Sequence, residues 1–166
     1  TDSVECAHLL KQKERSQQDA WTIKQGSILD DQFVKQITPS DVVYSWGVLH
    51  HTGRMWDAIE NAASCVKTGG QLAIAIYNDQ GVVSQLWGKV KQTYVKYPLS
   101  RVIFMAVFFP YLFAGRFTLR FLTGRLNKGT RGMTLWYDML DWLGGYPFEV
   151  AKPENVIEHL QKRGFI

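Results

Sequence analysis

The sequence is poor in cysteine and has no apolar run of the ~20 residues that a membrane-spanning helix needs. Its two cysteines, Cys6 and Cys65, form neither a Cys-x-x-Cys pair nor an evenly spaced framework, which argues against a disulfide-stapled secreted domain. We therefore expect a reducing compartment, with both thiols buried in the core. The polar, acidic first residues do not resemble a signal peptide, and a cytoplasmic location is predicted.

Acidic residues are missing from the segment 80–137, which carries nine of the 19 Lys and Arg residues. The rest of the chain holds the other ten basic residues and all 15 acidic ones, so the formal net charge of +4 arises within this segment. Over the whole length, 166 residues with 46% hydrophobic side chains predict a folded domain with a real core.

The chain is organised around residues 41–56, DVVYSWGVLHHTGRMW. The segment 41–44 reads as a short parallel strand that ends in small, polar and aromatic residues, and an open α/β sheet places its site where such a strand ends. Apolar residues at three- and four-residue spacing predict a helix over 55–66, stopped by a turn at 68–70. A second apolar strand over 72–77 would complete a right-handed crossover.

Two blocks, DVVYSWGVLHHTG at 41–53 and VKTGGQLAIAIYN at 66–78, resemble the fourth and fifth strand region of class I S-adenosylmethionine-dependent methyltransferases. They are closest to the small-molecule branch often labelled quinone-biosynthesis-like methylases. The resemblance implies a partial Rossmann-like, doubly wound α/β core over 1–79, a helical insertion over 80–130, and an acceptor-pocket loop with a C-terminal helix over 131–166. It also implies that the glycine-rich first turn precedes residue 1 and that further strands follow residue 166.

The resemblance further implies a two-part site for the cofactor S-adenosylmethionine. In the family, the turn after the third strand lies against the adenine ring, and here that strand is predicted over 21–25. The first part of the site is this turn, and the second follows the fourth strand and faces the methyl group. The implied cofactor-binding residues are Gly26, Ser27, Ile28 and Leu29 in the first part and Ser45, Trp46 and Gly47 in the second.

Ser27 departs from the family pattern, because many members carry an acid at this place. The departure leaves the backbone, or Asp30, to make the adenine contact. Apart from the resemblance, residues 26–31 also read as a strand-to-helix turn in which Asp30 or Asp31 caps a helix over 32–37. The two interpretations are compatible.

His50 and His51 are the candidate general bases, since histidine titrates near neutrality and can take a proton from a hydroxyl that is being methylated. The alternative is a histidine that only holds a backbone carbonyl. On a helical turn the two rings would point about 100° apart, so we expect only one to face the site. No metal site is predicted, because the spaced partners that such a site needs are missing.

Methyl transfer needs residues that position the acceptor, because the donor is already activated. Tyr77 and Asn78 at the end of the second strand suit that role. A later element, DWLGGYPFE at 141–149, is similar to one in the same methyltransferase branch, and the resemblance assigns it to the acceptor pocket. The implied residues are Asp138, Trp142 and Glu149 as acceptor contacts, with Asp141 as a further candidate base. The alternative is that these carboxylates pair with nearby arginines or cap the loop.

The basic segment contains VIFMAVFFPYLFAG at 102–115, which predicts two helices linked at a kink at Pro110. Three interpretations compete for it: a lid over the active site, a peripheral membrane contact through 101–125, and a nucleic-acid surface. The last is disfavoured, because the aromatics come in one apolar block. Beyond it, Pro153 begins a predicted helix with a stripe of Val156, Ile157 and Leu160 that ends at Gly164, and a strand is expected at 165–166.

The sequence therefore predicts methyl transfer from S-adenosylmethionine to a small, hydroxylated or lipophilic acceptor by direct in-line displacement. Two alternatives stay open. The first is a nucleotide-binding oxidoreductase of Rossmann type, and the second is a non-enzymatic module that binds a membrane surface through the basic segment. The pattern specifies no oligomeric state.

Overall fold

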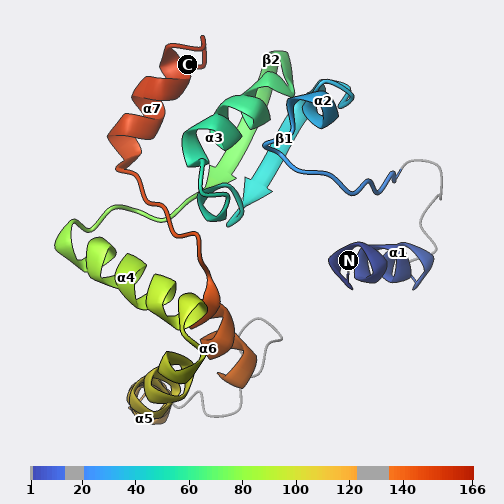
Figure 1. The fold of residues 1–166 in the computed structure, drawn as a ribbon. Helices are drawn as coiled ribbons and strands as arrows, with labels where there is room; N and C mark the ends of the chain where they lie inside the picture. The colour runs from blue at the N-terminus through green and yellow to red at the C-terminus, as the bar shows by residue number, and fades with distance from the viewer. Residues whose placement is uncertain (1, 14–20, 123–134) are drawn as a thin grey trace.

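The computed structural model describes residues 2–13, 21–122 and 135–166. Within these residues, helices precede, connect and follow two strands (Figure 1). Their order is α1 (Asp2–Lys13), α2 (Asp31–Val34), β1 (Ser40–Trp46), the 3-10 turn η2 (Leu49–His51), α3 (Met55–Ser64), β2 (Val66–Ala75), α4 (Val82–Lys96), α5 (Pro98–Leu122), α6 (Leu135–Gly144) and α7 (Pro153–Gln161).

Strands β1 and β2 pair in parallel, with Val42 opposite Gln71 and Trp46 opposite Ala75. Helix α3 connects them, so the predicted strand, helix, strand order is confirmed, and the chain is a mixed α/β protein. This small parallel sheet is compatible with the larger doubly wound architecture without establishing it. The Rossmann-like part of the expectation therefore stays a prediction.

Helix α3 and the final helix α7 pack with one face of the sheet (Figure 1). Buried Met55, Ile59 and Ala62 of α3 meet Leu72 and Ile74 of β2, because alternate residues of a strand point to the same face. The other face of β1 carries exposed Val42, Tyr44 and Trp46. Among the described residues, therefore, the hydrophobic core covers only one face of the sheet.

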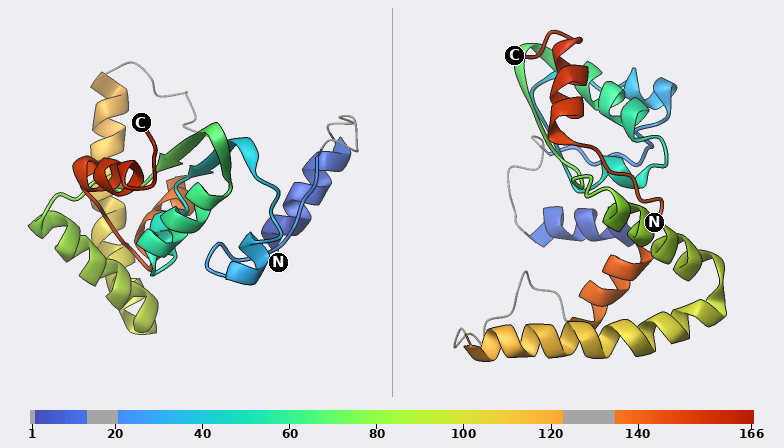
Figure 2. Two further views of the ribbon diagram at one scale, coloured as in Figure 1. Left: turned by 90° about the horizontal axis from the view of Figure 1, so that it is seen from above. Right: turned by 90° about the vertical axis from the view of Figure 1, so that its left-hand side faces the viewer.

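Helices α4, α5 and α6 form a second apolar cluster below the sheet in Figure 1. Its buried members are Tyr94 of α4 and Leu143 of α6, and Phe104 and Phe108 of α5 pack against them. Figure 2 shows α5 running as a long rod beneath the other elements. Among the described helices, none is both long and apolar enough to cross a membrane.

The turn predicted at 68–70 is wrong, because these residues lie within β2. Ser40 pairs with Val66 and Val42 with Gln71, so four residues of β2 stand opposite one residue of β1. This bulge needs glycine: a Cβ at Gly70 would lie 2.8 Å from the Asp41 carbonyl oxygen. The Gly-Gly pair therefore shapes a strand and does not terminate a helix.

Two further strand predictions are wrong. Residues 21–25 form no strand, since they have no strand partner in the part of the chain that the structure describes. Residues 165–166 instead close the end of α7, where Phe165 N–H donates to the Leu160 carbonyl and Gly164 has φ +88°. The predicted start of α7 at Pro153 is confirmed, whereas the helix ends at Gln161, three residues before the predicted stop at Gly164.

The prediction of two helices linked at Pro110 is also wrong, because α5 continues through Pro110 as a single 25-residue helix. Aromatic residues on the preceding turns pack against α4 and α6 and offset the lost backbone hydrogen bond. Cys65 is buried as expected, but Cys6 is exposed on α1. Ile157 is exposed too, because α7 presents Val156 and Leu160 to the core instead.

Candidate functional site

Polar and aromatic side chains gather at the carboxyl ends of the two parallel strands. β1 ends at Trp46, where Gly47 takes a φ of +75° and donates its N–H to the Ala75 carbonyl at the end of β2. The positive φ turns the chain directly into the 3-10 turn that carries the two histidines. Tyr77 follows β2 at the same edge of the sheet.

His50 is buried, with 2% of its surface exposed, and among the described residues neither ring nitrogen makes a hydrogen bond of good geometry, although the Ala75 backbone lies close enough to act on its pKa. Its ring centroid lies 4.2 Å from that of Tyr77 and 4.3 Å from that of His51. His51 also meets Tyr77, edge-on at 5.6 Å, and its Nδ1 lies 2.7 Å from the Pro147 carbonyl oxygen. The expectation that the two rings would diverge is wrong, because Tyr77 bridges them.

The segment 147–151 closes this site from a distant part of the sequence. Glu149 N–H donates to the His50 carbonyl, and the Glu149 carboxylate accepts from the N–H of Met55 at the start of α3. Two residues further on, Ala151 N–H donates to the Tyr77 carbonyl. Both strand-end loops are therefore held by one extended segment, and Glu149 stabilises the amino terminus of α3.

Lys91 of α4 is the principal residue that sequence reasoning missed. Its side chain is 4% exposed, and its Nζ donates to the Trp142 carbonyl and lies 5.2 Å from the centroid of the Phe148 ring. A signal existed in the helix pattern. Lys91 shares a face with Trp87 and Tyr94, four and three residues away, so the periodicity places it on the buried side of α4. The count of charges alone includes it only among the nine basic residues of segment 80–137.

Burial and neighbouring charges shift the pKa values of three side chains here. Burial, with the positive charges of His51 and Lys91, lowers the pKa of His50 to about 4. Burial lowers the pKa of Lys91, and the smaller effect of the negative charge of Asp141 raises it. For Tyr77, burial and then the Asp141 charge raise the pKa. At neutral pH, His50 is an uncharged acceptor and Tyr77 an intact donor.

The two predicted parts of the cofactor site are not brought together by the described residues. Ser45, Trp46 and Gly47 lie at the strand ends, whereas the turn at 26–29 lies against α3, where the Asn61 amide donates to the Ile28 carbonyl at 2.8 Å. Asn61 is six residues along α3 from Met55, about 9 Å along the helix axis. Figure 1 shows the neighbouring α2 towards the opposite end of the strands.

Local contacts account for the residues of that turn. Ser27 Oγ accepts from Leu29 N–H, Gly26 adjoins the ring of Phe33, and Ile28 and Leu29 pack against the core. Asp30 caps α2 by accepting from the N–H groups of Gln32 and Phe33, which confirms the capping prediction. The short helix ends at Val34, earlier than expected.

The residues predicted to contact the acceptor do not all lie in the same place. Asp141 lies close enough to Tyr77 and Lys91 for its charge to affect both. Trp142 packs on Trp87 of α4, with ring centroids 4.4 Å apart, and Asn78 is exposed beside Ala151. The side chain of Asp138 lies outside the described residues. Of the predicted polar set, His50, His51, Tyr77 and Asp141 share one neighbourhood.

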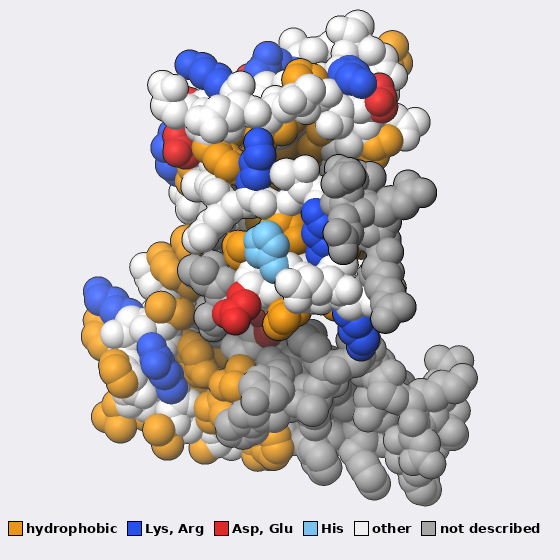
Figure 3. All heavy atoms as spheres, turned by 90° about the vertical axis from the view of Figure 1, so that its right-hand side faces the viewer, with side chains coloured by type: hydrophobic (Ala, Val, Ile, Leu, Met, Phe, Trp, Pro, Cys, Tyr) orange, Lys and Arg blue, Asp and Glu red, His pale blue; other side chains and the backbone are white. Residues whose placement is uncertain are grey.

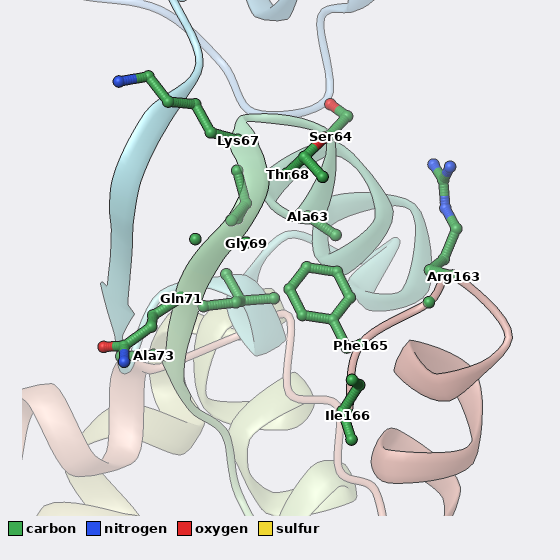
Figure 4. Close-up of a pocket in the computed structure, with 14 residues that line it drawn as sticks. Ala63, Ser64, Lys67, Thr68, Gly69, Gln71, Ala73, Arg163, Phe165 and Ile166 are labelled. Atoms are coloured by element: carbon green, nitrogen blue, oxygen red, sulfur yellow. The ribbon is translucent and has the colours of Figure 1, made fainter.

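A cavity of about 820 Å³ lies elsewhere, along the start of β2 and the end of α7. Figure 4 shows Lys67, Gln71, Arg163 and Phe165 around it. None of the predicted site residues lines this cavity. Among the side chains that the structure describes, no three His, Cys, Asp or Glu residues gather to hold a metal ion.

The comparisons with known proteins found no matching family model, no match among curated proteins and no match among solved structures. The site must therefore be interpreted from its own chemistry.

Proposed function

We propose that this chain carries the acceptor side of an S-adenosylmethionine-dependent methyltransferase that acts on a small hydroxylated molecule. One observation carries the proposal: His50, His51 and Tyr77 converge at the carboxyl ends of two parallel strands, where an open α/β sheet places its site. The sequence resemblance named above supports the same class. Of the two parts expected to hold the cofactor, the stretch Ser45 to Gly47 lies at the end of β1, at this edge of the sheet, whereas the turn at 26–29 lies against α3.

Bound S-adenosylmethionine would supply an activated methyl group to an acceptor oxygen placed in line with it. The chain's own residues would orient that oxygen and remove its proton. Neutral His50 offers a ring nitrogen that makes no well-formed hydrogen bond to any described residue, and the protonated Tyr77 hydroxyl can donate to the acceptor. Lys91 and Asp141 would set the charge around both groups.

Trp46 gives the proposal a second physical support. Its ring is exposed at the end of β1 and stacks on Tyr44 with an angle of 8° between the planes. Exposed aromatic faces attract cations, including a sulfonium, by about 0.5–1 kcal/mol. A donor bound across the strand ends would meet this ring.

The test is a calorimetric titration of the protein with S-adenosylmethionine, S-adenosylhomocysteine and, separately, NADH. We expect the first two to bind, and Trp46→Ala to weaken S-adenosylmethionine about threefold, because the cation–π attraction is lost. S-adenosylhomocysteine lacks the sulfonium charge, so its affinity should change less. Trp56→Ala is the control, at a tryptophan of α3 that is 38% exposed and packs on His159 of α7. A folded protein that binds NADH alone, or no nucleoside at all, would refute the methyltransferase proposal.

A further inference from the structure

Helix α5 is apolar on two sides, and the described residues cover only one of them. Phe104, Met105 and Phe108 face inward onto the Tyr94 and Leu143 cluster. The outward side carries a stripe of large apolar residues at three- and four-residue spacing, each between 56% and 75% exposed. We call it the α5 stripe: Leu99, Val102, Ile103, Val107 and Tyr111.

Helices α4 and α5 carry charge of one sign. The segment 80–137 holds nine basic residues and no acidic one, and Lys89, Lys96 and Arg101 of α4 and α5 are exposed. Figure 3 shows hydrophobic and basic side chains together over α5, at the lower left of that view. These two helices therefore have no negative charge of their own, and Lys89 and Lys96 are exposed basic groups beside Arg101, which donates to the Tyr94 and Val95 carbonyls.

We propose that the α5 stripe docks on the surface of an anionic lipid bilayer. A helix lying in the membrane interface needs an apolar face that sinks to the acyl boundary and basic groups that reach the headgroups, and α5 with its neighbours provides both. Its 25 residues extend about 37 Å, so the helix can lie flat along a membrane with the whole stripe in contact.

Charge and composition favour this occupant over two others. A second copy of the chain would bring two such basic segments together, and their charges would repel. A single-stranded nucleic acid would need exposed rings for its bases, and the α5 stripe is aliphatic except for Tyr111. An anionic bilayer satisfies the apolar stripe and the positive charge at once. The inference does not depend on the proposed methyl transfer.

The test is flotation of the protein with vesicles of phosphatidylcholine mixed with phosphatidylglycerol, and with vesicles of phosphatidylcholine alone. We expect strong partitioning to the mixed vesicles, weaker partitioning to the neutral ones, and release from the mixed vesicles as salt is raised. Val107→Glu should lower partitioning at least about tenfold, because it removes apolar contact and adds a repelled charge. Val102→Glu on the same stripe should act alike.

The matched control is Val42→Glu on β1, where the valine is 58% exposed against 59% for Val107. This variant adds the same charge away from α5 and should float like the wild type, with unchanged far-ultraviolet circular dichroism in all variants. Equal partitioning of the Val42 and Val107 variants would overturn the proposal. A wild-type protein that does not bind anionic vesicles would also overturn it, whether that protein forms a dimer in light scattering or binds an oligonucleotide.

Discussion

His50 combines complete burial with a pKa lowered to about 4, and this combination makes the stability of the protein depend on pH. In the unfolded chain the imidazole titrates near its usual value of 6.5. Between these two values the unfolded state binds more protons than the folded state. The free energy of unfolding contributed by His50 is therefore fully present above pH 6.5 and is lost as the pH falls towards 4.

We expect this loss to reach about 3 kcal/mol, from a shift of about two and a half pKa units. Urea unfolding at a series of pH values from 7 to 4 measures it. In His50→Leu the slope between pH 6.5 and 4 should flatten, because the titrating group is gone. His8→Leu, at an exposed position on α1, should leave the slope unchanged. A wild-type slope that survives in His50→Leu would assign the pH dependence to other groups.

At the scale of elements, the bulge in β2 is the feature that the local sequence pattern concealed. Gly69 takes a φ of +78°, and Gly70 approaches the Asp41 carbonyl and the Val66 side chain too closely for any Cβ. Both glycines stand where a helix stop was expected. A glycine pair can end a helix or form a β-bulge, so only the pairing of β2 with β1 shows which of the two is present.

Gly70→Ala should destabilise the protein by about 1–3 kcal/mol, because the new methyl group would lie 2.8 Å from the Asp41 oxygen and 2.9 Å from Val66 Cγ1. Gly115→Ala is the control on the exposed side of α5, where a Cβ meets nothing within 4 Å and helix propensity favours alanine by up to about 1 kcal/mol. Urea unfolding of the two variants should shift in opposite directions. A Gly70 variant as stable as the wild type would show that the bulge can relax.

At the scale of the whole molecule, the chain holds two apolar clusters that have no residue in common. One joins α3, β2 and α7, and the other joins α4, α5 and α6. The second cluster meets the strand ends at three residues, Lys91, Trp142 and Phe148. The candidate site is therefore built at the junction of the two, and its geometry depends on both clusters.

Truncation of one cluster should loosen that cluster first. Leu143→Ala and Ile59→Ala each remove a fully buried side chain and should cost about 2–5 kcal/mol of global stability. Native-state hydrogen exchange should accelerate mainly in α4 and α6 for the first variant and mainly in α3 and β2 for the second. Uniform acceleration across all helices in both variants would mean that the two clusters unfold as a single unit.

What the sequence determined by itself is local. The amphipathic pattern of α3, an aspartate cap at the start of α2 and the start of α7 at Pro153 each depend on residues within a few positions of one another, and the structure confirms them. The two histidines are candidate general bases for a similar reason, because they follow directly after a predicted strand.

The tertiary structure decided everything that needed a distant partner. It placed segment 147–151 against both strand ends, which turned Glu149 into a partner of α3 and paired His51 with Pro147, almost a hundred residues away. Among the described residues it gives 21–25 no strand to pair with, although their composition suits a strand. It also buried Lys91 beside His50, and that burial gives the site its shifted pKa values. Such effects arise from desolvation and long-range contact, which sequence spacing does not encode.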